Sequence, residues 1–202
     1  MNITMIGAGN VGTTLGEQFA RVGHDVIYGV RNPQDPKYHA LQVDTIEKAL
    51  VEAEIVCLTT PWAAAFETVK SLDLKGKILV DCTNPIKPML AGLEYGTDTS
   101  GAEQIAQLTE ASVVKAFNTT GVENMKNPHY GDLRVFMPVC SDDIQAAQTV
   151  AELASAIGFD GRYIGPLQCA RYLEPYAMVW IHMAIKGGFG RQFAWVMQER
   201  SH

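Results

Sequence analysis

The stretch MIGAGNVGTTLGEQFA, residues 5–20, holds the pattern G-x-G-x-x-G at Gly7, Gly9 and Gly12. The apolar run before it predicts a strand over residues 2–7, and the apolar spacing after it predicts a helix over residues 11–22. Between a strand and a helix, the first glycine permits a tight turn and the second lets a pyrophosphate approach the backbone. The third lets the helix pack against the strand, and the helix N-terminus offers free N–H groups. This stretch therefore predicts a site for a dinucleotide.

Short apolar runs alternate with helical patterns along the rest of the chain. Further strands are expected over residues 25–30, 41–43, 54–60, 77–83, 112–117, 133–140 and 159–165. Helices are expected over 45–53 after a cap at Asp44, after Pro61, over 101–108, over 143–156 after a cap at Asp142, and over 167–197 with a break at 187–188. The alternation predicts an α/β fold, namely a Rossmann-type doubly wound, mostly parallel sheet. Residues 1–165 form the expected nucleotide-binding domain, and residues 166–202 a small helical segment packed on it as one structural unit.

The composition excludes several classes of protein. The 202 residues are 47% hydrophobic and 19% charged, as in ordinary globular proteins, and the formal net charge is −6. A nucleic-acid surface needs clustered cations, so this balance argues against one. No signal peptide is recognised, and the longest apolar stretch, residues 176–185, is shorter than the ~20 residues that span a bilayer. The four cysteines lie far apart without C-x-x-C, so we expect a cytoplasmic protein with no metal, no nucleic-acid partner and no membrane contact.

The end of the second predicted strand selects among dinucleotides. There the stretch DVIYGVRNP places Arg31 where many such folds place an acid that accepts hydrogen bonds from the ribose 2′-hydroxyl. Asp25 stands at the opposite end of this strand, too far away to do so. An arginine can instead form a paired, charge-assisted contact to a 2′-phosphate. Thr13 and Asn32 are expected to add hydrogen bonds, and Lys37 is a second candidate cation, so the pattern predicts NADP(H) rather than NAD(H).

Polar side chains follow three other predicted strands. Thr59 and Thr60 come after the strand at 54–60, Asn84 after the strand at 77–83, and Asn118 after the strand at 112–117. In an open parallel sheet the carboxyl ends of the strands form the crevice where ligands bind. We therefore expect these side chains to face the ligand.

Several segments resemble one family. The stretch MIGAGNVGTTLGEQFARVGHDVIYGVRNP is similar to the opening of the NADP oxidoreductases that depend on coenzyme F420, and to the cytoplasmic reductase domain of the STEAP metalloreductases. The likeness continues in the same order through LTTPW (58–62), ILVDCTNP (78–85), VVKAFNT (113–119) and GPLQCARYLEPYA (165–177). This resemblance implies a Rossmann domain with a small C-terminal helical portion. It also implies NADPH across the strand ends, with a second redox cofactor or a small substrate on the nicotinamide.

The resemblance also assigns residues by position. The residues that match the phosphate-binding turn of the family are Gly7, Gly9, Asn10, Val11 and Gly12. Arg31 matches the 2′-phosphate residue, although Val30 stands where family members often carry serine. The residues that match the turn beside the central part of the cofactor are Thr59, Thr60 and Pro61, and those that match two polar positions near the nicotinamide are Asn84 and Asn118.

No side chain stands in a persuasive setting for acid–base catalysis, so the catalytic residues stay unassigned. There is no Tyr-x-x-x-Lys pair. His182 lies in an apolar helix, where a hydrogen-bonded core role is expected. Lys115 lies within a strand, where pairing with a carboxylate or snorkelling is expected. Hydride transfer between a nicotinamide and a flavin-like ring needs no such group. We therefore predict an NADPH-dependent oxidoreductase with coenzyme F420, FAD or FMN as the small-molecule acceptor.

Two other functions stay open at this point. One is the reduction of a small imine or carbonyl compound, which would need a catalytic helix after this domain; the chain is expected to be too short for a large one. The other is a non-catalytic module that senses NADP. Independently, the helix expected around residues 170–186 is apolar on more than one face. Such a helix is buried in its own core or against a second subunit, which favours a homodimer.

Overall fold

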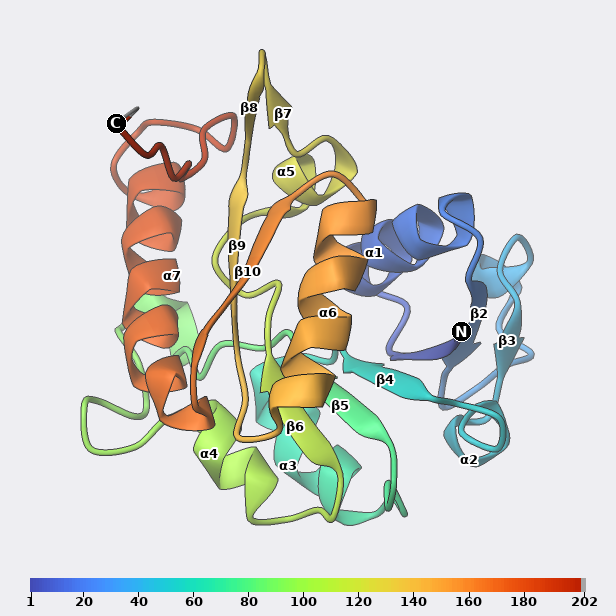
Figure 1. Ribbon diagram of the computed structural model, residues 1–202. Coiled ribbons are helices and arrows are strands. Elements are labelled where there is room, and N and C mark those ends of the chain that lie inside the picture. The colour runs from blue at the N-terminus through green and yellow to red at the C-terminus, as the bar shows by residue number, and fades with distance from the viewer. Residues whose placement is uncertain (201–202) are drawn as a thin grey trace.

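The computed structural model describes residues 1–200, and its centre is one sheet of eight strands (Figure 1). In their order across the sheet, the strands are β3 (Val43–Asp44), β2 (Asp25–Gly29), β1 (Asn2–Ile6), β4 (Ile55–Leu58), β5 (Ile78–Asp81), β6 (Ser112–Lys115), β9 (Phe136–Cys140) and β10 (Asp160–Gly165). The first six run parallel, whereas β9 is antiparallel to β6 and parallel to β10. The order β3-β2-β1-β4-β5-β6 is that of a Rossmann fold, so the predicted doubly wound, mostly parallel sheet is confirmed.

Helices cover both faces of the sheet (Figure 1). They are α1 (Asn10–Arg21), α2 (Ile46–Ala49), α3 (Trp62–Lys70), α4 (Gly101–Ala106), α5 (Val122–Lys126), α6 (Ile144–Ala156) and α7 (Ala170–Ile185). One core cluster joins α1, α5 and α6 to the sheet, and a second joins α3, α4 and α7. Successive residues of β4 pack into opposite clusters: Cys57 belongs to the first cluster, whereas Val56 and Leu58 belong to the second. A strand covered on both faces must be apolar throughout, which explains the run IVCL. Within residues 1–200, no helix is both long enough and apolar enough to cross a membrane.

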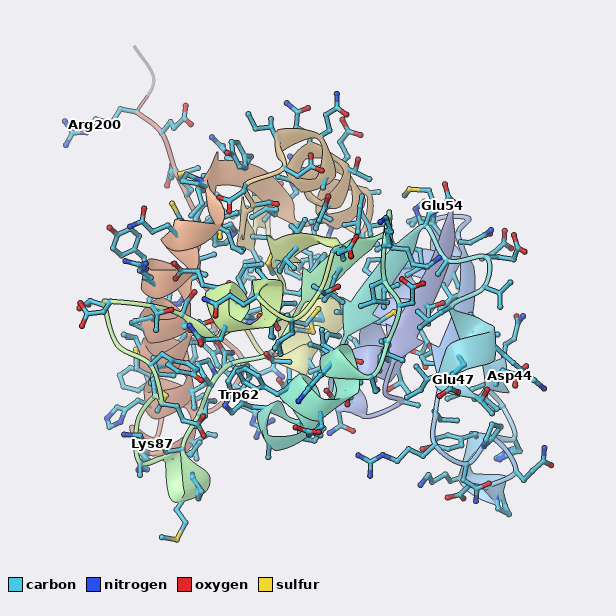
Figure 2. All side chains as sticks on the ribbon, turned by 90° about the horizontal axis from the view of Figure 1, so that it is seen from below. Asp44, Glu47, Glu54, Trp62, Lys87 and Arg200 are labelled. Atoms are coloured by element: carbon cyan, nitrogen blue, oxygen red, sulfur yellow. The ribbon has the colours of Figure 1, made fainter. Side chains whose placement is uncertain are left out.

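Two helix caps differ from the prediction by one residue. Thr45 rather than Asp44 caps α2, because Asp44 still belongs to β3 and its carboxylate accepts a hydrogen bond from the Thr45 N–H (2.7 Å). The helix is also shorter than the expected 45–53, and Figure 2 shows Asp44 at the periphery of the molecule. Asp143 rather than Asp142 caps α6, while Asp142 accepts a hydrogen bond from the Leu167 N–H (3.0 Å).

The chain beyond α7 is not helical, contrary to the prediction for residues 167–197. After α7 it folds back above the end of this helix as an irregular segment, residues 188–200, which we call the C-terminal strap (Figure 1). The Phe193 ring stacks on Trp180 (5.3 Å between centroids), and the Phe193 carbonyl accepts a hydrogen bond from Trp180 Nε1 (2.9 Å). Trp195 stacks on Tyr176 (5.4 Å). The final two residues of the expected segment 166–202 lie outside the described part of the chain.

Candidate nucleotide-binding site

The glycine turn lies between β1 and α1, at the carboxyl edge of the sheet. Gly7 has a φ of +102°, a conformation that side-chain-bearing residues rarely adopt, and its N–H donates to the Gly29 carbonyl at the end of β2 (3.2 Å). A Cβ added to Gly12 would clash with the Gly7 carbonyl oxygen and stand 2.7 Å from Thr59 Oγ1. The fold itself therefore requires glycine at the first and third positions of the motif.

Gly9, by contrast, faces open space. No atom outside its immediate chain neighbours would lie within 4 Å of a Cβ added there. Gly9 precedes α1, which begins at Asn10 and has no side-chain hydrogen bond at its cap. The N–H groups of the first helical turn, on Asn10, Val11 and Gly12, have no acceptor within the helix. Together with Gly9 they form an N-terminal cradle suited to an anion.

The end of β4 lies directly beside this turn. The Thr59 hydroxyl stands 3.0 Å from both the Ile6 and the Gly7 carbonyl oxygens, and so holds the turn against β4. The next residue, Thr60, has a buried hydroxyl oxygen with no hydrogen-bond partner within residues 1–200. A buried polar atom left unpaired costs about 1–3 kcal/mol. The position therefore fits a ligand group that hydrogen-bonds to this hydroxyl.

These residues line one open groove of about 550 Å³, which extends from the glycine turn to the loop after β2. The predicted site residues that the structure brings together in this groove are Gly7, Gly9, Arg31, Asn32, Thr59, Thr60 and Pro61. The sequence analysis missed several other groove residues, among them Tyr38 and Ile46. Tyr38 ends a short 3₁₀ turn that follows Asp35 and opens with Pro36. An Asp-Pro start signals such a turn, so this wall of the groove could have been found.

Arg31 is the groove cation that is available to an anion. Among the contacts of residues 1–200, its guanidinium makes no hydrogen bond or ion pair, and the residue is exposed. The Lys37 ammonium is instead paired with Asp35 (2.8 Å) and lies 4.8 Å from the centroid of the Tyr38 ring. The hydrogen bond from Lys37 lowers the pKa of Asp35, so this carboxylate stays charged and paired. Arg31 therefore offers the free positive charge on this wall.

Asn84 and Asn118 form a separate pair beyond the ends of β5 and β6. Asn84 Nδ2 donates to the Asn118 carbonyl (2.9 Å), and Asn118 Nδ2 donates to Asn84 Oδ1 (3.0 Å) and to the Leu173 carbonyl (3.3 Å). Asn118 is 4% exposed, and its Oδ1 has no hydrogen-bond partner in the described part of the chain. Its two amide hydrogens are fixed by two acceptors, so the free oxygen has a defined direction and suits a ligand that carries an N–H group.

Other candidate residues are occupied within the protein. The Thr13 hydroxyl donates to the Gly9 carbonyl (2.9 Å), and Asn32 Oδ1 accepts a hydrogen bond from the backbone of the loop that follows it. Trp62 is buried and donates from Nε1 to Glu94 Oε2 (2.7 Å). His182 was expected in the core, and this expectation was wrong, because the residue is exposed on α7.

Lys115 is paired with carboxylates, which is one of the two roles expected for it from the sequence. Its ammonium lies 2.8 Å from Asp81 Oδ2 and 3.1 Å from Glu174 Oε1, and its side chain is fully buried. Burial by itself lowers the pKa of Lys115, but the two carboxylates outweigh it and raise the pKa above the usual value of 10.5. Lys115 is therefore a charged interior group, held by two carboxylates, rather than a proton donor facing the groove.

Comparisons with known proteins agree with this geometry. Residues 2–85 match the family described as coenzyme F420-dependent NADP oxidoreductase. The F420-dependent NADP reductase of Methanothermobacter marburgensis is 30% identical over 210 residues, which cover 92% of this chain and 93% of that relative. A crystal structure from Arthrobacter sp. FB24, described as a candidate F420-dependent NADP reductase, superposes with a TM-score of 0.88 at 27% identity, over 98% of this chain and 100% of that chain.

The STEAP metalloreductase relatives match over a smaller part of their length. The metalloreductase STEAP3 of Rattus norvegicus is 31% identical over 178 residues, which cover 85% of this chain but 35% of that protein. This chain thus spans about a third of the length of that relative. The glycine turn, the sheet order and the similarity to the Methanothermobacter marburgensis reductase over nearly its full length lead to one conclusion. The chain belongs to the family of coenzyme F420-dependent NADP oxidoreductases.

Proposed function

We propose that the groove binds NADPH with its pyrophosphate at the N-terminal cradle and its 2′-phosphate at Arg31. The observation that carries this proposal is the unpaired Arg31 guanidinium on the groove wall, just beyond β2. The open space at Gly9 fits the pyrophosphate, and the unpartnered Thr60 hydroxyl fits the central part of the cofactor. Asn118 Oδ1 then accepts a hydrogen bond from the nicotinamide carboxamide. When bound, NADPH would supply the hydride, and the role of the protein is to bind and orient the cofactor.

We further propose coenzyme F420 as the hydride acceptor, with FAD or FMN as the related alternative. The near-full-length similarity to the reductase of Methanothermobacter marburgensis supports F420. A flavin-like acceptor also agrees with the state of Lys115 at the end of β6, because its ammonium is held by Asp81 and Glu174 and is not free to serve as a proton donor. Hydride exchange between two redox rings needs no side-chain proton relay.

The acceptor can be identified by anaerobic mixing of the purified protein and NADPH with F420, FAD and FMN in separate reactions. We expect oxidation of NADPH with stoichiometric reduction of F420. Turnover of small cyclic imines or carbonyl compounds, without reduction of F420, would favour an imine or carbonyl reductase. Tight NADPH binding without turnover of any acceptor would favour a module that senses NADP.

Replacing Arg31 with alanine should remove most of the preference for NADPH. We expect the wild-type protein to bind NADPH at least about tenfold more tightly than NADH, since one good charge-assisted phosphate contact supplies that much. In Arg31→Ala the affinity for NADPH should fall toward that for NADH, and the affinity for NADH should hardly change. Calorimetric titration of both nucleotides measures this difference.

The control is Arg21→Ala, which removes the same charge from the exposed end of α1, away from the groove lining. It should leave the preference intact. An equal loss of affinity for both nucleotides in Arg31→Ala would show that the arginine supports the fold and not the 2′-phosphate.

We also propose that the protein is a homodimer joined through the outer face of α7. Between residues 172 and 185 the sole Asp, Glu, Lys or Arg is Glu174, which is buried. Tyr172, Val179 and Ile185 are half exposed or more. Val179→Lys should therefore convert a dimer into a monomer in analytical ultracentrifugation at micromolar concentration. A wild-type monomer under the same conditions would disprove the dimer.

A further inference from the structure

Three charged side chains meet in the interior between the sheet and α7. Asp81 ends β5, Lys115 ends β6 and Glu174 lies on α7, and their exposed fractions are 0%, 0% and 1%. The Lys115 ammonium contacts both carboxylates (2.8 and 3.1 Å) and donates to the Thr83 carbonyl (2.6 Å). We call Asp81, Lys115 and Glu174 the buried triad.

The two carboxylates have further partners besides the ammonium. Glu174 Oε2 accepts a hydrogen bond from the Gly101 N–H (2.9 Å), and Oε1 accepts one from the Ala102 N–H (3.2 Å), so α7 is joined to α4. Asp81 Oδ1 accepts hydrogen bonds from the N–H (2.9 Å) and the hydroxyl (2.6 Å) of Thr83. The triad is thus fully hydrogen-bonded. A buried ion pair is nevertheless weak evidence for stability, since apolar residues of similar volume often serve as well.

The triad touches the neighbours of the asparagine pair. Leu173, whose carbonyl accepts from Asn118 Nδ2 (3.3 Å), is the residue immediately before Glu174. Thr83, whose carbonyl accepts from Lys115, is the residue immediately before Asn84. The Asn118 amide group thus donates to Asn84 and to Leu173. Each of these two residues is next in sequence to a residue that belongs to the triad or is hydrogen-bonded to it. A shift of α7 relative to β6 would release the Leu173 carbonyl and let Asn118 Oδ1 turn.

We propose that Glu174 is a positioning residue for the nicotinamide half of the cofactor. Glu174 binds Lys115 and so fixes the position of α7 relative to β6. In this position the Leu173 carbonyl holds the Asn118 amide group, and Asn118 Oδ1 points to the ligand. This inference rests on the proposed binding of NADPH in the groove. This role of Glu174 differs from a purely structural one, because its loss should weaken binding of the nicotinamide half of the ligand only.

The test compares two ligands that differ only in the nicotinamide, NADPH and 2′-phospho-ADP-ribose. The wild-type protein should bind NADPH about five to ten times more tightly than the fragment, the ratio that one hydrogen bond to a buried group supplies. In Glu174→Gln this ratio should fall to near one, while the affinity for the fragment stays within about twofold. Asn118→Ala should give the same result. A Glu174→Gln protein that loses affinity for both ligands equally, or for neither, would overturn the proposal.

A matched control is Glu103→Gln. Glu103 pairs with Arg171 (2.7 Å) and also joins α4 to α7, but within residues 1–200 it makes no hydrogen bond to the asparagine pair. It should leave the ratio unchanged. Should Glu174→Gln fail to fold, Thr83→Val removes only the hydroxyl bound to Asp81 and should lower the ratio by a smaller factor. An unchanged ratio in Thr83→Val would then count against the triad.

The outcomes also separate this inference from the assignment of the groove. Equal affinity of the wild-type protein for NADPH and the fragment would contradict the positioning role, yet leave the contact of Arg31 with the 2′-phosphate intact. Failure to bind either ligand would remove both proposals.

Discussion

Replacing Gly12 with alanine should lower the free energy of unfolding by about 3 kcal/mol, the upper part of the usual range for forcing an extra carbon into a packed interior. The added Cβ would meet the Gly7 carbonyl oxygen and Thr59 Oγ1. Neither can yield easily, because Gly7 holds a left-handed turn and the Thr59 hydroxyl is bound to the Ile6 and Gly7 carbonyls. The turn would have to open, and NADPH binding should be lost with it. Urea unfolding and calorimetric titration measure the two effects.

The control for this prediction is Gly9→Ala, two residues away from the turn carbonyl. Its φ of −84° suits alanine, and no atom would stand within 4 Å of the new methyl group. The free energy of unfolding should therefore change by less than about 0.5 kcal/mol. The methyl group would occupy the space proposed for the pyrophosphate, so NADPH binding should fall sharply in a stable protein. If Gly12→Ala leaves the protein as stable as Gly9→Ala, the close approach of α1 to β1 is wrong.

The sheet and the groove could be predicted because their signals are local. The glycine turn and Arg31 each stand directly after a strand that a short apolar run identifies. In a parallel sheet, two residues that follow different strands meet at the same edge whatever the distance between them in the chain. The same rule brings Thr59 and Thr60 to the turn. Once the strands are recognised, the groove follows from their order.

The parts that could not be predicted depend on contacts between distant segments. The sequence suggests a carboxylate partner or snorkelling for Lys115, but nothing local identifies Glu174, which lies in α7 and is separated from β6 by α5, β9, α6 and β10. The direction of Asn118 Oδ1 depends on the backbone of Leu173, which carries no sequence signal. The apolar spacing of the C-terminal strap is also typical of a helix. Its aromatic residues Phe193 and Trp195 instead stack on side chains of α7, a contact that the sequence pattern does not reveal.

The largest loss of stability among charge substitutions is expected for Lys115→Met. Methionine fills a similar volume but leaves Asp81 and Glu174 without their common cation in a fully buried setting. Breaking a buried ion pair in this way costs about 3–5 kcal/mol. In the wild-type protein the pKa of Lys115 is raised by its carboxylates, so the contribution of the ammonium is complete below the usual value of 10.5. It is lost only as the pH rises through the higher folded-state pKa. Urea unfolding at neutral pH therefore measures the full effect.

We attribute the loss of stability in Lys115→Met to the burial of the two unpaired carboxylates rather than to the loss of an ion pair as such. Two comparisons distinguish these two explanations. Lys75 forms a pair of similar length with Glu110 (2.9 Å), but both side chains are more than two-thirds exposed, so Lys75→Met should hardly change stability. Neutralising the whole triad, with Asp81→Asn and Glu174→Gln added to Lys115→Met, should recover much of the loss, because no unpaired charge then stays buried. Equal costs for Lys115→Met and Lys75→Met would show that the interior charges are hydrated and that the triad does not tie α7 to the sheet.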